Sequence, residues 1–146
     1  MSDLVFDDKP PTSFWIFGGA ALVWNLIGLV AYISTVMMPP EALAKMTEDA
    51  QQFYTSTPAW ATGAFALAVT SGVVGSLLLL LRKAWAVPLF VVSLLSVIVQ
   101  NVDAFILRDA FGILGINSVI LPSLVFVVAV LLLIYSRSCK ENGWLN

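Results

Sequence analysis

The sequence predicts an all-α fold, a transmembrane four-helix bundle with an external amphipathic helix between the first and second spans. Three observations carry this prediction. Of the 146 residues, 60% are hydrophobic and only 11% are charged, whereas soluble domains carry about 25% charged residues. Four long apolar runs divide the chain, and the segment between the first two runs has apolar side chains at helical spacing.

Each of the four apolar runs can cross a bilayer, alone or with a short extension. A span needs about 20 apolar residues, because the hydrocarbon core is about 30 Å thick and a helix rises about 1.5 Å per residue. We expect spans at about 14–37, 59–81, 84–107 and 116–136, within one integral membrane domain that covers 1–146.

The first run is expected to stay in the membrane and not to be a cleaved signal peptide. It is longer than a typical signal-peptide core, an acidic segment precedes it, and no small-residue cleavage site follows. The preceding residues, Met1–Pro11, are expected to form a short polar tail.

The third run is the most informative, because its apolar part is too short to cross. The apolar part runs from Ala84 to Val99 and has only 16 residues. The helix must therefore continue through polar residues to about Leu107. This places Gln100 and Asn101 inside the outer half of the bilayer, with Asp103 near its edge.

The loop between the first two spans predicts an amphipathic helix over about 40–55. Pro40 and Glu41 favour a helix start. Apolar side chains then recur at spacings of three, four and three, at Leu43, Met46, Ala50 and Phe53. Polar side chains occupy the opposite face, so we expect this helix to lie on the outer membrane surface or to cap the bundle.

Lysine and arginine residues predict the orientation of the bundle. With four spans, five of these cations fall on one side, namely Lys9, Arg82, Lys83, Arg137 and Lys140. The other side holds Lys45 and Arg108. By the positive-inside rule, both termini are expected in the cytoplasm.

Stripes of small residues predict how the first two spans pack. Span two carries small residues four apart, at Ala64, Ala68, Gly72 and Ser76. Span one has a comparable face, made of Gly18, Ala21, Asn25, Gly28 and Tyr32. Small residues let membrane helices approach closely, so we expect the two stripes to meet. The alternative is that alanine and glycine are simply frequent in membrane helices.

Polar residues inside the spans are the candidate ligand-binding residues. The set is Asn25, Ser96, Gln100, Asn101 and Asp103. An amide without a partner in hydrocarbon costs several kcal/mol, so these groups should face inward. Two interpretations are open: a polar cavity for a small solute, or hydrogen bonds that hold the helices together, which we favour.

The acidic and basic residues after span three form a separate cluster. It contains Asp103, Arg108 and Asp109. We expect these residues to mark a solvated helix end. The alternative is an external gate or binding site, since buried charges in membrane proteins mark ion and proton routes.

Composition excludes several functional classes. There is no histidine, and Cys139 is the single cysteine, so no internal disulfide and no multi-cysteine metal site is expected. We predict no catalytic residues, no metal and no cofactor, and therefore no enzyme. The net charge of −2 without a basic patch predicts no nucleic-acid partner. Cys139 itself is expected to be an inert thiol, with lipidation as the alternative.

Four stretches also carry a resemblance to known proteins. They are "FWIFGGAALVWNLIGLVAY", "YTSTPAWATGAFALAV", "GSLLLLLRKAWAVPLFVVSLLSVIVQ" and "LLLIYSRSCKENGWL". Together they resemble a group of small bacterial four-span inner-membrane proteins that are often automatically labelled "sugar transporter". The resemblance implies a multi-pass protein of the bacterial cytoplasmic membrane.

Two functional hypotheses follow. The first is an accessory or structural bundle that acts through helix packing, with the lipid bilayer and either a second copy or another membrane protein as partners. The second is an oligomeric transporter or channel for a small neutral solute such as a sugar. The second is motivated by uncharged polar residues without a charge at mid-membrane.

Overall fold

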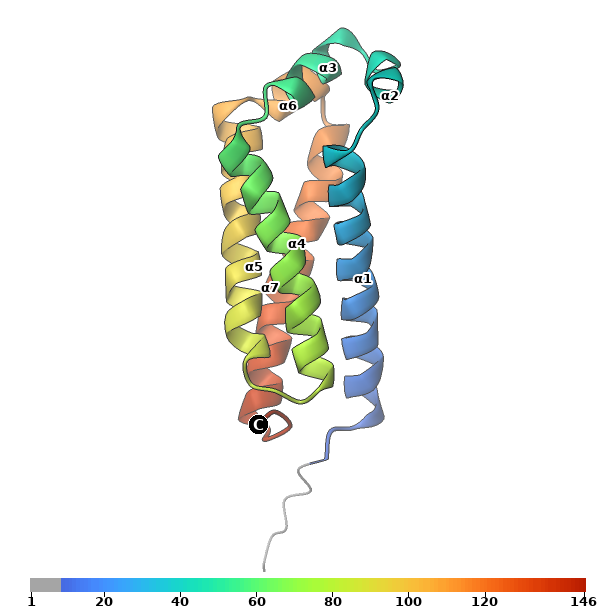
Figure 1. Ribbon diagram of the computed structural model, residues 1–146. Coiled ribbons are helices and arrows are strands. Elements are labelled where there is room, and N and C mark those ends of the chain that lie inside the picture. Colours follow the sequence, from blue (N-terminus) through green and yellow to red (C-terminus); the bar gives the residue numbers. More distant parts are fainter. Residues whose placement is uncertain (1–8) are drawn as a thin grey trace, which may run out of the picture.

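The computed structural model describes residues 9–146, so most of the expected polar tail lies outside the described residues. Within this range the chain forms helices and turns and has no strand. Four helices are long and apolar enough to cross a membrane. They are α1 (Thr12–Val36), α4 (Ala59–Leu80), α5 (Ala86–Asn101) continued by the π-helix η1 (Val102–Leu107), and α7 (Asn117–Glu141). Three short helices, α2 (Pro40–Ala44), α3 (Glu48–Thr55) and α6 (Ala110–Leu114), lie together at one end, called here the α3–α6 end (Figure 1).

The lengths of the spans agree with the lengths that the bilayer requires. The third span continues through its polar residues and ends at Leu107, as predicted. Its last six residues widen into a π-helix, and the Arg108 N–H donates to the Asp103 carbonyl at 3.0 Å to close it. The fourth helix runs beyond its expected end at Ser136 and stops at Glu141.

The segment between the first two spans differs from the single helix expected over 40–55. It forms α2 and α3, which are separated at Lys45–Thr47. The break has a local cause, because the Thr47 hydroxyl accepts from the Ala50 N–H at 3.2 Å and starts a new helix. Apolar spacing alone could not detect this cap, so the prediction of one continuous amphipathic helix is not confirmed.

The two small-residue stripes do meet, between α1 and α4. The Asn25 Nδ2 donates to the Ser76 hydroxyl at 3.1 Å and to the Ala21 carbonyl at 2.8 Å. Gly72 lies directly against this amide, since a Cβ added there would overlap the Asn25 Oδ1. The absence of a side chain at Gly72 therefore permits the hydrogen bond between the two spans.

Replacing Gly72 with alanine is expected to destabilise the bundle by about 1 to 2 kcal/mol, because the new methyl displaces Asn25 and overpacks the contact. Gly63 on the same helix is the matched control, since nothing lies within 4 Å of a Cβ there. Gly63→Ala should be neutral or stabilising through helix propensity. Thermal unfolding midpoints in mild detergent compare the two variants, and equal midpoints would contradict the packing.

The opposite end, called here the C-terminal end, is closed by residues that follow α7. The Asn146 N–H donates to the Arg82 carbonyl at 2.8 Å, and the Ala84 N–H donates to the Asn146 carbonyl at 2.8 Å. The Arg82 Nε also donates to the Trp144 carbonyl at 2.9 Å. A hydrophobic cluster lies directly beneath, made of Phe14, Leu79, Ala86, Phe90, Cys139 and Leu145.

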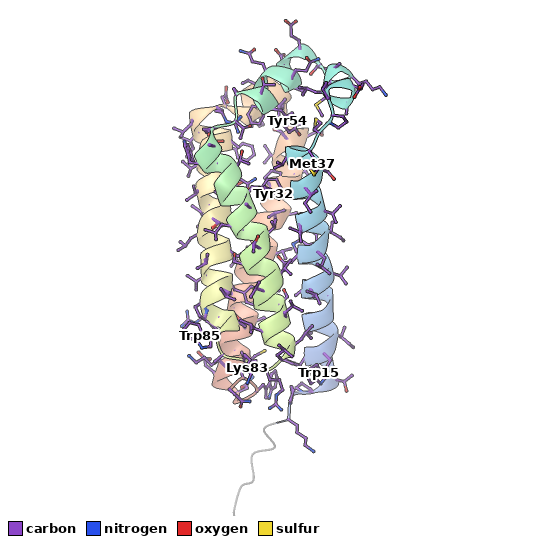
Figure 2. The ribbon with its side chains drawn as sticks, viewed as in Figure 1. Trp15, Tyr32, Met37, Tyr54, Lys83 and Trp85 are labelled. Atoms are coloured by element: carbon purple, nitrogen blue, oxygen red, sulfur yellow. The ribbon has the colours of Figure 1, made fainter. Side chains whose placement is uncertain are left out.

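Side chains at this end follow the pattern of a membrane interface. Figure 2 shows Trp15, Lys83 and Trp85 together near the C-terminal end, while Met37 and Tyr54 lie near the α3–α6 end. Cys139 is fully buried in the cluster, which favours the inert thiol over a lipidation site.

Candidate functional site

A cavity of about 770 Å³ lies inside the bundle at the α3–α6 end. All four spans contribute to its lining, together with α3, η1 and α6. Figure 1 shows α3 and α6 crossing over this end of the bundle, above the ends of the spans. The cavity is therefore lined by the four long helices at its sides and by short helices above.

The floor of the cavity is a packed apolar layer at the middle of the bundle. Val97 and Val125 line the cavity and also belong to this layer, which Ala68 and Ala129 complete. Just below, the Ser93 hydroxyl donates to the Ala68 carbonyl at 2.8 Å and ties α5 to α4. This layer lies between the cavity and the C-terminal end where α4, α5 and α7 meet.

An ion pair joins the cavity wall to its roof. Arg108 donates to Asp103 Oδ2 from Nη2 at 2.6 Å and from Nε at 2.9 Å. Its Nη1 donates to the Phe53 carbonyl at 2.6 Å and to the Thr57 hydroxyl at 3.1 Å. The guanidinium also lies 4.1 Å from the centre of the Phe53 ring. One side chain thus links the end of the third span to α3.

This geometry corrects the expectation that Asp103, Arg108 and Asp109 mark a solvated helix end. The Asp103 side chain is only 2% exposed and Arg108 only 16%. Asp109 alone behaves as a helix-end residue, because its carboxylate accepts from the Gly112 N–H at 3.1 Å and caps α6. The prediction was wrong because α6 packs against η1 and α3 packs against α6, and because Arg108 pairs with the buried Asp103 carboxylate.

Five side chains with uncharged polar groups line the cavity without an internal partner for those groups. Within residues 9–146, the polar groups make no hydrogen bond to the rest of the chain, and the residues are Tyr54, Thr62, Gln100, Asn101 and Asn117. Gln100 lies seven residues before the end of its span at Leu107, which is about 10 Å along the helix. Among the described residues, none of these groups is a fully buried polar atom without a partner, so water or a ligand in the cavity can reach them and bond to them.

A further acceptor comes from α7. Pro122 lies inside this helix and lines the cavity together with Ser118. Because proline has no N–H, the Ser118 carbonyl loses its usual donor one turn along. A carbonyl without its helical donor thus lies at a residue that lines the cavity.

The structure brings together some of the predicted site residues and separates others. Gln100, Asn101 and Asp103 all line the cavity. Asn25 does not, because it bonds Ser76 at the α1–α4 contact. Ser96 is also outside and donates to the Val92 carbonyl of its own helix at 2.8 Å. Asn25 and Ser96 therefore have structural bonds, and the five residues do not form one site.

Sequence reasoning missed the residues that come from distant segments. Phe53 and Thr57 line the cavity and accept hydrogen bonds from Arg108, and nothing in their local sequence indicates this. Asn117 had a signal, because it is an amide at the start of a span. Thr62 resembles any small polar residue of a membrane helix.

Among the residues that the structure describes, no three His, Cys, Asp or Glu side chains gather in a group that could hold a metal ion. No family model, no curated protein and no solved structure matches this chain. Function is therefore inferred from the chemistry of the cavity itself.

Proposed function

We propose that this chain is a multi-pass membrane protein that binds a small uncharged ligand by hydrogen bonds in the cavity at the α3–α6 end. The observation that carries the proposal is the set of polar groups that line this cavity without a hydrogen-bond partner in the chain. Ligand sites are commonly apolar hollows with a few convergent polar groups, and this cavity has that composition.

The charges in the cavity favour an uncharged ligand. Asp103 and Arg108 are the lining residues that carry a charge at neutral pH, and they neutralise each other. The remaining polar side chains of the lining are amides and hydroxyls, which can donate and accept but add no charge. An ion entering the cavity would lose its hydration shell and would find no counter-charge. A polyol or an amide would replace its hydrogen bonds to water with hydrogen bonds to the side chains of the cavity.

The proposal includes an orientation. Lys9, Arg82, Lys83, Arg137 and Lys140 lie toward the C-terminal end, and the positive-inside rule supports placing that end in the cytoplasm. The cavity then faces the opposite side of the membrane. A bacterial inner membrane, which the resemblance implies, fits this arrangement, and ligand would reach the cavity from outside the cytoplasm.

An accessory role through helix packing has less support. This hypothesis rests on the two small-residue stripes. The stripes pack against each other inside one chain, through Asn25, Gly72 and Ser76. They are not available to a second copy. Assembly into an oligomer stays a prediction that the stripes do not favour.

A binding experiment tests the proposal directly. The purified protein in nanodiscs is titrated with glycerol, glucose and acetamide, and with glycerate as a charged analogue, while its thermal unfolding midpoint is followed. We expect at least one uncharged solute to raise the midpoint, and glycerate to have no effect. Gln100→Leu and Asn101→Leu should each weaken binding by about tenfold, because each removes a hydrogen bond to the ligand.

The matched control for these variants is Ser96→Ala, which changes a polar residue of the same helix outside the cavity. It should leave the affinity unchanged. The proposal fails if no uncharged solute binds, or if Ser96→Ala weakens binding as much as Gln100→Leu.

Transport of the same ligand is a second candidate function, favoured because all four spans line the cavity. Transport would require the floor at Val97 and Val125 to open toward the C-terminal end. Flux of the bound solute into proteoliposomes separates the two functions. Uptake that Gln100→Leu abolishes would indicate a transporter, and binding without uptake would leave a binding protein.

A further inference from the structure

A second hollow lies on the outer side of the cavity, between η1 and α7. It is smaller, about 240 Å³, and it shares Asn101, Phe105 and Pro122 with the large cavity. The rest of its lining is mostly apolar, with Val119, Ser123, Phe126 and Val127. The two hollows therefore border each other at three residues, one of which is an unpaired amide.

The shape of the bundle explains why this groove exists. Figure 1 shows α7 leaning away from α5 toward the α3–α6 end, where α6 bridges the gap between them. The wedge between the two helices begins where α5 changes into the wider η1. Pro122 faces it from α7. Both departures from regular α-helix thus occur where the two hollows meet, and π-helical segments are frequent at functional sites.

The groove faces the hydrocarbon if the four spans cross a bilayer. Phe126 is 38% exposed and Val127 is 50% exposed, both on the outer surface of α7. Val127 lies ten residues after the start of its helix at Asn117, which is about 15 Å along it. The groove therefore runs from the polar cavity toward the middle of the bilayer, and its surroundings there are acyl chains.

We propose that the ligand is a single-chain amphipath with an uncharged, hydrogen-bonding head group. The head group binds Gln100 and Asn101 in the cavity, and its single acyl or alkyl chain leaves sideways through the groove between η1 and α7. A monoacylglycerol or an alkyl glycoside has this chemistry. This inference rests on the proposed function and adds the class of ligand and its route from the bilayer.

The arrangement of polar and apolar groups supports this class over a free polyol. A free polyol would leave the groove to be filled by lipid chains, with the Asn101 amide at its inner edge facing them. An amphipath places its own polar head at that amide and its own chain in the groove. Such a ligand fills both hollows and leaves no polar group exposed to hydrocarbon.

The test compares the affinities of chain-bearing ligands and of their free head groups. Both are measured on the wild-type protein and on a variant whose new side chain fills the groove. Tritiated 1-decanoylglycerol and decyl glucoside are bound to the protein in nanodiscs, alongside glycerol and glucose. We expect at least one of the two chain-bearing ligands to bind more than about tenfold tighter than its free head group, since each buried methylene contributes to affinity. Val127→Trp should abolish this advantage and leave the affinity for the free head group unchanged.

Leu131→Trp is the matched control, because Leu131 is 57% exposed one turn further along α7 and lines neither hollow. It should leave the chain's advantage intact. The inference is overturned if neither chain raises affinity, or if Val127→Trp and Leu131→Trp behave alike. The proposed function is tested separately by the free head group. It is supported if Gln100→Leu weakens binding of the free head group, and it is contradicted if that variant has no effect.

Discussion

Replacing Arg108 with methionine is expected to cost about 3 to 5 kcal/mol of stability and to release α3 from the bundle. The substitution leaves the Asp103 carboxylate buried without its cation, and removing one partner of a buried pair is strongly destabilising. It also removes the donors to the Phe53 carbonyl and the Thr57 hydroxyl, which hold α3 over the cavity. Thermal unfolding in detergent measures the first effect, and protease cleavage within residues 45–57 measures the second.

Lys45→Met is the matched control, because Lys45 is an exposed cation at the same end of the bundle. It should change neither the unfolding midpoint nor the cleavage rate. Adding Asp103→Asn to the Arg108 variant should recover part of the stability, since no charge is then left buried. If Arg108→Met unfolds at the same temperature as Lys45→Met, the ion pair has no structural role.

The second large effect is expected from Leu145→Asp at the C-terminal end. Leu145 is 7% exposed and packs in the cluster with Cys139. A carboxylate would not stay in that cluster, so residues 143–146 should leave their site. The cost is then limited to what docking contributes, about 2 kcal/mol for the leucine and about 1 kcal/mol for each hydrogen bond, or about 3 to 5 kcal/mol in all.

Maleimide labelling of Cys139 provides a direct measurement, because this cysteine is the single one in the chain and is fully buried. Leu145→Asp should make it reactive under conditions in which the wild type is not labelled. Asn142→Asp adds the same charge at an exposed position and should leave labelling slow. Slow labelling in both variants would show that residues 143–146 do not shield the thiol.

The length of a membrane span made the third helix predictable. Its apolar part was too short, and the bilayer thickness required the helix to include Gln100, Asn101 and Asp103, as it does. The stripe pattern also predicted the α1–α4 contact correctly, down to Asn25 and Gly72. Both arguments depend on quantities that are local in sequence, namely length and spacing.

The cavity could not be predicted in the same way, because it depends on where helix ends converge. Arg108 meets Phe53 and Thr57 across more than 50 positions of sequence, and no local pattern encodes that meeting. The break at Thr47 required weighing a capping hydroxyl against apolar spacing. Asn25 was grouped with Gln100 because both are intramembrane amides, although residue type alone says nothing about which helix face each occupies.

The two contacts that close the ends of the bundle also set the order in which it can assemble during synthesis. Asn25 can bond Ser76 as soon as two spans are in the membrane, whereas Arg108 can reach Phe53 only after the third span has been made. Asn146 can reach Arg82 only after the fourth. The α1–α4 contact can therefore form in an early insertion intermediate while both ends of the bundle are still open.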